Sequence, residues 1–194
     1  MYPKPRQPIE YPDNYGTKRY AGGMVRPISD RKPSPAPIGR YTWDLTKQAI
    51  DGQSEFEPDV FDGYAIEYIN PTTGEDANGR IGARMQKLPV EFKGKAHRHT
   101  HSSVYTVHKG SGYTIINGER FDWEAGDFFV VPVWAWHEHV NTSDEEAFLF
   151  SANDLPIMET FGFEREEAYS ENDGHQKVEK VFEPKLFEDS IKIE

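Results

Sequence analysis

Histidine is the residue type in this sequence that points most clearly to chemistry. Six of the seven histidines lie between residues 97 and 139. His97 and His99 are two apart in a segment expected to be a β-strand, where alternate residues share one face. His137 follows a second expected strand, at residues 128–131. In a barrel, this strand can lie opposite the strand that carries His97 and His99. Three neutral imidazoles that meet are good ligands for iron, zinc, copper or nickel, so we expect a metal site here; the competing interpretation is three ordinary polar side chains.

The remaining histidines of this region have other expected roles. His139 shares a face with His137 if the segment is extended, so it is either an acid or base for a reaction or a surface histidine. His101 lies on the ligand face but beyond the pair, and His108 lies off that face near a strand end; neither is expected to bind metal. Because the chain contains no cysteine, thiolate metal sites, thiol catalysis and disulfides are excluded.

The segments that must position these histidines have the pattern of short β-strands separated by turns. Asn117-Gly118, between two apolar segments, is the strongest short-range signal for a β-hairpin. Short strands at regular spacing predict an all-β sandwich or barrel, and no convincing helical pattern precedes residue 160. The expected strands cover residues 64–69, 81–88, 99–107, 113–116, 119–123, 128–131 and 147–151.

Charge and hydropathy limit the partners of the protein. The 194 residues carry a net charge of -11, and the first 50 hold nine Lys or Arg against four Asp or Glu. No run of Lys and Arg exceeds two residues there, and an acidic body repels phosphate, so nucleic-acid binding is not expected. No run of about 18 apolar residues predicts a membrane span, and the first residues lack the apolar region of a signal peptide. We therefore expect a cytoplasmic protein.

Two motifs in the histidine-rich region resemble those of the cupin superfamily. The first is Gly94-Lys-Ala-His97-Arg-His99, with Gly110 eleven residues later, and the second contains Gly126, Pro132, His137 and Asn141. The segments Gly126-Asp-Phe-Phe-Val-Val-Pro132 and Trp134-Ala-Trp136-His137-Glu-His139 are similar, more specifically, to the gentisate 1,2-dioxygenase family. That family includes salicylate and 1-hydroxy-2-naphthoate dioxygenases. The resemblance covers roughly residues 64–170.

The resemblance implies a single cupin barrel, a jelly roll or double-stranded β-helix, with an extended N-terminal arm. Residues 1–60 would form this Pro- and Tyr-rich arm, residues 61–170 the barrel, and residues 171–194 an acidic tail. The resemblance also implies Fe(II) bound by His97, His99 and His137, with His139 as a catalytic residue lining the active site. The implied reaction opens the ring of a hydroxylated aromatic, such as gentisate, salicylate or a hydroquinone, and inserts both atoms of O2.

Two positions depart from the usual motifs and bear on the substrate. The glutamate that cupins carry five residues after the second histidine is Val104 here, a loss that the dioxygenase family shares. Three neutral ligands leave Fe(II) its full charge, which favours a bidentate, anionic substrate. Several family members carry an arginine where this chain has Tyr105. Either Arg84 binds a substrate carboxylate instead, or the substrate lacks one; Arg84, Gln86 and Tyr105 are the expected substrate-binding residues.

Family members are typically two fused cupin halves, and this chain has room for one. We therefore expect a homodimer or larger homo-oligomer, in which the arm or a partner covers the surface of the missing half. Two other functions fit the same motifs. One is a non-catalytic metal cupin that binds or senses a small aromatic, and the other is a different metal-dependent cupin enzyme, such as a diketone dioxygenase or an isomerase.

Overall fold

The computed structural model describes residues 14, 28, 39–71 and 73–184. The chain divides between Ala36 and Pro37, and every element named below belongs to the second part. Most of the predicted N-terminal arm and residues 185–194 of the predicted tail therefore lie outside the described residues. Among those described, no helix is long and apolar enough to cross a membrane.

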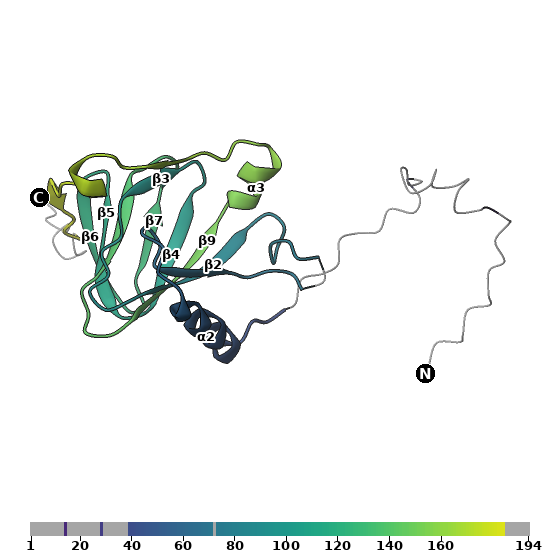
Figure 1. Ribbon diagram of the computed structural model, residues 1–194. Coiled ribbons are helices and arrows are strands. Elements are labelled where there is room, and N and C mark those ends of the chain that lie inside the picture. Colours follow the sequence, from purple (N-terminus) through teal and green to yellow (C-terminus); the bar gives the residue numbers. More distant parts are fainter. Residues whose placement is uncertain (1–13, 15–27, 29–38, 72, 185–194) are drawn as a thin grey trace, which may run out of the picture. The chain divides into compact units, whose positions relative to one another are not determined.

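Two β-sheets face each other and enclose the interior of the molecule (Figure 1). The prediction of an all-β fold is confirmed, and every strand pair is antiparallel except that of β11 with β6. The first sheet has the strand order β1 (Tyr64–Glu67), β2 (Gly82–Leu88), β9 (Ala147–Asn153), β4 (Ser103–Lys109) and β7 (Phe128–Val131). The second has the order β10 (Glu166–Ala168), β3 (His97–His99), β8 (His137–Asn141), β5 (Ser111–Ile116), β6 (Glu119–Glu124) and β11 (Lys180–Val181).

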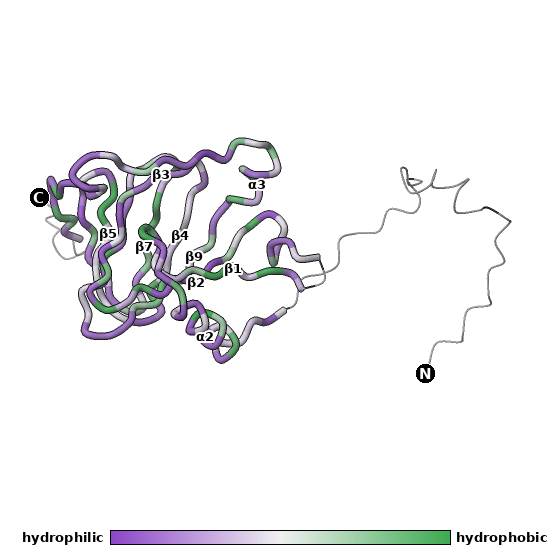
Figure 2. Tube along the Cα trace, in the orientation of Figure 1, coloured by the Kyte–Doolittle hydropathy of each residue, from purple (hydrophilic) through white to green (hydrophobic). Residues whose placement is uncertain are grey.

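The apolar side chains of these strands pack between the two sheets. Alternation along the strands directs one set of side chains inward, as the period-2 pattern predicted. Figure 2 shows apolar stretches on strands such as β5 and β7, whereas the loops that connect the strands are mostly hydrophilic. The buried cluster consists of Leu88, Tyr105, Val107, Ile116, Trp123, Val131, Ala135, Ala147 and Leu149.

The predicted hairpin is present between β5 and β6. Asn117 and Gly118 both have positive φ, 49° and 81°, as the tight two-residue turns of hairpins require. The turn is also tied to the segment before β8, because the Asn117 side chain accepts a hydrogen bond from the backbone N–H of Trp136 at 3.0 Å. The hairpin thereby supports the approach to His137.

The expectation of no helix before residue 160 was wrong. Helix α2 (Trp43–Gly52) lies against the five-stranded sheet, followed by the short helix η3 (Gln53–Glu55) (Figure 1). Trp43, Thr46 and Ile50 have helical spacing, and Ile50 packs with Met85 and Phe148 of the sheet. A buried face of only three residues, one of them a threonine, is a weak signal for a helix in the sequence. Helices α3 (Leu155–Thr160) and η4 (Asn172–Gly174) follow β9 along the chain.

The first part of the predicted acidic tail packs on the six-stranded sheet. Strand β11 pairs with β6, and Gln176 is buried. The Gln176 side chain donates a hydrogen bond to the carbonyl of Ile115 and accepts one from the N–H of Gly118. Its backbone N–H donates to the buried carboxylate of Glu138 at 2.9 Å. These contacts are polar, so the apolar pattern of the sequence did not indicate them.

Candidate metal centre and active site

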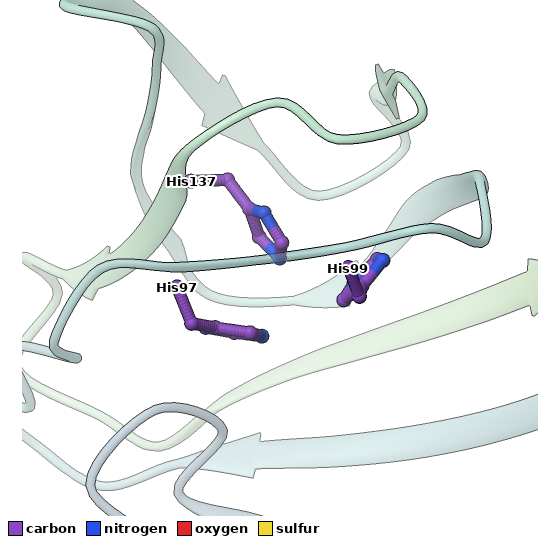
Figure 3. Close-up of side chains that lie close together, drawn as sticks. All are labelled: His97, His99 and His137. Atoms are coloured by element: carbon purple, nitrogen blue, oxygen red, sulfur yellow. The ribbon is translucent and has the colours of Figure 1, made fainter. Parts of the chain in front are cut away.

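Three histidines from two neighbouring strands converge inside the barrel (Figure 3). His97 and His99 alternate on β3, so both rings leave the same face, and β8 pairs with β3 such that His137 lies directly opposite His97. One nitrogen atom from each of the three rings lies within 4.8 Å of the others. The structure therefore brings together the three residues that the sequence predicted as metal ligands.

The hydrogen bonds of these rings leave nitrogen lone pairs free for a metal. Nδ1 of His99 lies 2.7 Å from the carbonyl of His101, and Nδ1 of His137 lies 3.0 Å from the carbonyl of Ala135. A carbonyl only accepts, so each Nδ1 carries the proton and each Nε2 keeps its lone pair. Nε2 of His137 and Nδ1 of His97 are buried and have no hydrogen-bond partner among the described residues. Backbone carbonyls commonly orient metal-binding histidines in this way.

Burial favours the neutral form of His99 and His137, which is the protonation state that binds metal. It lowers the pKa of His99 to about 4 and the pKa of His137 well below its ordinary value, since each charged ring would lose its hydration. Neighbouring imidazoles lower both pKa values further. At neutral pH His99 and His137 thus offer uncharged nitrogen donors. With His97 they form a set of three imidazoles that fits a divalent transition metal.

No carboxylate joins the three histidines in the cluster found among the described residues. Val104, at the position of the usual cupin glutamate, is 47% exposed, and it points away from the interior. The sequence lacks the usual glutamate at this position, and in the structure the side chain that replaces it lies outside the histidine cluster. A metal held here would keep its full positive charge.

Cation–π contacts behind the ligands stabilise the turn before His137. Arg98, between the two ligands of β3, points to the opposite face and lies over the rings of Trp134 and Trp136, with its guanidinium carbon 4.4 and 4.2 Å from their centres. Trp134 has φ of 58° and donates its backbone N–H to the carbonyl of His99. The two tryptophans therefore pack against Arg98 behind the ligands.

A cavity of about 220 Å³ adjoins the histidines. It is smaller than the roughly 300 Å³ at which drug-sized binding pockets begin, so it suits a small ligand. Its wall is mostly polar. The lining residues are Asp62, Arg84, Gln86, His97, His99, His101, Ser103, Tyr105, Ser151, Leu155, Glu159, Glu164 and Glu166.

All three residues predicted to bind substrate line this cavity. Arg84 forms an ion pair with Glu67, at 2.7 Å between Nη2 and the carboxylate. Gln86 is 3% exposed and donates from Nε2 to Asp62 at 2.6 Å. Tyr105 stacks on Phe129, and burial raises the pKa of its phenol. Their contact with substrate stays a prediction.

His139 lies close to the ligands but is not part of the cavity wall. It is fully buried, with Nδ1 2.9 Å from the hydroxyl of Thr114, and that hydroxyl also accepts a hydrogen bond from Trp123. Its ring lies 4.9 Å from the Tyr105 ring and 5.7 Å from the His137 ring, and its Nε2 has no partner among the described residues. Burial lowers its pKa to about 3, so it is neutral at pH 7.

Several residues that line the cavity did not emerge from the sequence, among them Asp62 and Glu164. Asp62 belongs to a turn before β1, and burial raises the pKa of its carboxyl. Glu164 accepts a hydrogen bond from Thr100 and lies 3.1 Å from Nδ1 of His101. His101 stacks on His99 with ring centres 3.5 Å apart and stays outside the ligand cluster. His108, by contrast, is exposed and contacts Trp43.

Comparison with known proteins identifies the barrel. The sequence model of the cupin domain family matches residues 84–153, which contain all three histidines. The chain contains a cupin domain. The matched region of this cupin runs from β2 to the end of β9 and includes both histidine strands, β3 and β8.

The cupin is similar in sequence to proteins named as 1,2-dioxygenases of aromatic compounds. It is 39% identical over 175 residues to 5-aminosalicylate 1,2-dioxygenase of Comamonas, covering 89% of this chain and 46% of that protein. It is 35% identical over 161 residues to gentisate 1,2-dioxygenase 1 of Aquipseudomonas alcaligenes, covering 82% and 46%. The chain thus spans about half the length of the curated relatives that it matches.

A solved structure extends the likeness to three dimensions. Salicylate 1,2-dioxygenase from Pseudaminobacter salicylatoxidans superposes with a TM-score of 0.64 at 30% identity. The superposition covers 78% of this chain and 45% of that enzyme. The resemblance that the two motifs indicated is therefore confirmed in both sequence and fold.

Proposed function

We propose that this cupin is a non-haem, Fe(II)-dependent dioxygenase that opens the ring of a small hydroxylated aromatic. The observation that carries the proposal is the convergence of three buried histidines beside a small cavity. The relatives named 1,2-dioxygenases support the reaction class, and the choice of Fe(II) among the metals that three imidazoles bind rests on the same likeness. Bound Fe(II) would supply adjacent coordination positions for the phenol and O2 and a path for electrons between them.

The residues of the chain would position the reactants. His97, His99 and His137 would hold the metal, and His97 and His99 also line the cavity that would take the substrate. The cavity volume suits a single ring with small substituents, as in gentisate, 5-aminosalicylate, salicylate or hydroquinone. Arg84, Gln86 and Tyr105 are the proposed substrate contacts because all three line the cavity beside the ligands.

The reaction itself is tested by its products. The Fe(II)-loaded protein should consume O2 in step with such a phenol and yield a ring-opened product that contains both oxygen atoms. Mass spectrometry of the product made under ¹⁸O₂ checks this. A product with one labelled atom, or consumption of O2 with the ring intact, would contradict the proposal.

We propose His139 as an acid–base or hydrogen-bonding residue of this reaction. Its free Nε2 is buried near Tyr105 and His137, and Thr114 fixes the orientation of its ring. His139→Gln should lower kcat about 100-fold, a typical effect of losing an acid–base group, with the metal content unchanged. His108→Gln, which alters an exposed histidine, is the matched control. A His139→Gln enzyme with undiminished kcat would remove this role.

We also propose that the protein is a homo-oligomer. Val104, Phe128 and Val130 lie together on the outer face of β4 and β7, with Val104 directly opposite Val130, and Phe128 is 73% exposed. Contiguous exposed apolar surface of this kind marks interaction sites. Light scattering at micromolar concentration should give the mass of at least two chains, and Phe128→Glu should reduce it. A monomeric wild-type protein would contradict this expectation.

A further inference from the structure

Gln86 presents an unsatisfied hydrogen-bond acceptor at the cavity. It lies on β2, is 3% exposed and lines the cavity wall. Its Nε2 donates to Oδ1 of Asp62, whereas its Oε1 is buried and has no partner among the described residues. A buried carbonyl oxygen without a donor costs on the order of 1–3 kcal/mol, so a ligand that supplies a donor there is favoured.

Asp62 determines which end of the Gln86 amide is free. The oxygen and nitrogen of an amide have nearly the same shape, so only the partners distinguish the two orientations. A carboxylate oxygen accepts hydrogen bonds, so the NH2 group must face Asp62 and the oxygen must face elsewhere. The acceptor character of Gln86 toward the cavity therefore depends on Asp62.

The backbone around Asp62 holds its side chain in place. Asp59 and Gly63 form a two-way backbone bridge, at 2.7 and 3.1 Å, and the Asp59 side chain accepts hydrogen bonds from the N–H groups of Phe61 and Asp62. Gly63 has φ of 69°, and a Cβ there would lie 2.7 Å from the carbonyl of Lys87 on β2. The turn thus sits directly against the strand that carries Gln86, and Asp62 has little freedom to turn away.

The other charges of the cavity wall favour the same kind of ligand. Glu159, Glu164 and Glu166 add carboxylates, all of which accept hydrogen bonds. Arg84 is the cation of the wall, and its ion pair with Glu67 offsets its charge. Beyond the metal ligands, the wall is therefore richer in acceptors than in donors.

We propose that Asp62 and Gln86 form a specificity site for a substituent of the substrate ring. The site favours a ring that carries a hydrogen-bond donor, such as a hydroxyl or amino group. It disfavours a ring that carries only an acceptor there, such as a nitro group or a second carboxylate. The inference rests on the proposed function for its substrate class, because it assumes a metal-bound phenol in the cavity. Asp62 acts here by orienting Gln86, and Gln86 contacts the ring substituent.

The test compares the binding of matched ligands with that of matched variants. The probes are salicylates that carry a hydroxyl or a nitro group at ring position 4 or 5, and calorimetry under argon on the Fe(II)-loaded protein measures their dissociation constants. Asp62→Asn frees the amide of Gln86 to turn its NH2 group toward the cavity. It should therefore lower the preference for hydroxyl over nitro about tenfold at the position that faces Gln86, with one metal still bound per chain.

Asp144→Asn is the matched control, since it makes the same substitution at an exposed carboxyl that is not part of the cavity wall. It should leave the preference unchanged, and Asp62→Ala should lower it as Asp62→Asn does. An unchanged preference in both Asp62 variants, or an equal loss in Asp144→Asn, would overturn the proposal. Because binding is measured without O2, a protein that selects the donor ligands but opens no ring would contradict the dioxygenase function and leave this inference standing.

Discussion

A variant with alanine at both His97 and His137 should not bind the one divalent metal per chain expected of the wild-type protein. These residues supply two of the three nitrogen donors, and His137 has a buried Nε2 with no partner among the described residues. Loss of an outer-shell partner alone typically weakens metal binding about 10–100-fold, so removal of two ligands should weaken it well beyond 100-fold. Metal analysis after dialysis and a titration with Fe(II) or Zn(II) under argon measure the effect.

The control for this experiment is His108→Ala, which removes an exposed histidine that contacts Trp43 outside the cluster. It should bind metal as the wild type does. Both proteins should keep their circular dichroism spectra, because the histidine cluster adjoins the apolar core and is not part of it. A double variant with full metal content would show that His97 and His137 are not ligands.

The metal-free protein should lose stability as the pH falls from about 7.5 to 5. Burial lowers the pKa of His99 and of His101 to about 4 and that of His139 to about 3, whereas unfolded histidines titrate near 6.5. Between these values the unfolded chain binds more protons than the folded one, so acid favours unfolding. At about 1.4 kcal/mol per pKa unit, His99 alone should cost about 2 kcal/mol at pH 5.

Three carboxyls act in the opposite direction. Burial raises the pKa of Asp62, of Asp76 and of Glu138, so each stabilises the folded state on acidification. The buried histidines outnumber them, and we expect a net loss of several kcal/mol, which is large against a total stability of about 5–15 kcal/mol. Urea unfolding in the presence of a chelator measures it. His101→Gln should flatten the pH dependence, and a stability that is constant from pH 7.5 to 5 would contradict the assignment of buried, neutral histidines.

The sequence allowed prediction of the ligands because their positions follow from local rules. Alternation along a strand places His97 and His99 on one face, and the glycine and proline of the second motif mark the turns on either side of the strand that leads to His137. The hairpin at Asn117-Gly118 was predictable for the same reason, since few residues tolerate the positive φ of both positions.

The features that were missed depend on contacts between distant segments. Asp62 lies in an Asp-Gly turn that has the composition of a solvent-exposed loop. The close packing of Gly63 against the backbone of Lys87 brings Asp62 within hydrogen-bonding distance of Gln86. Gln176 anchors the tail through polar hydrogen bonds that leave no apolar pattern. Helix α2 is defined by its packing on Met85 and Phe148 more than by its own residues.

The most direct test of the central claim is O2 uptake by protein reconstituted with Fe(II) under argon. The phenols to be offered are gentisate, salicylate, 1-hydroxy-2-naphthoate, hydroquinone and catechol, with His137→Ala as the control. We predict that at least one of them causes uptake of one O2 per ring consumed, and that His137→Ala abolishes the uptake. No uptake with any of these phenols, with iron demonstrably bound to the three histidines, would contradict the assignment of a ring-cleaving dioxygenase.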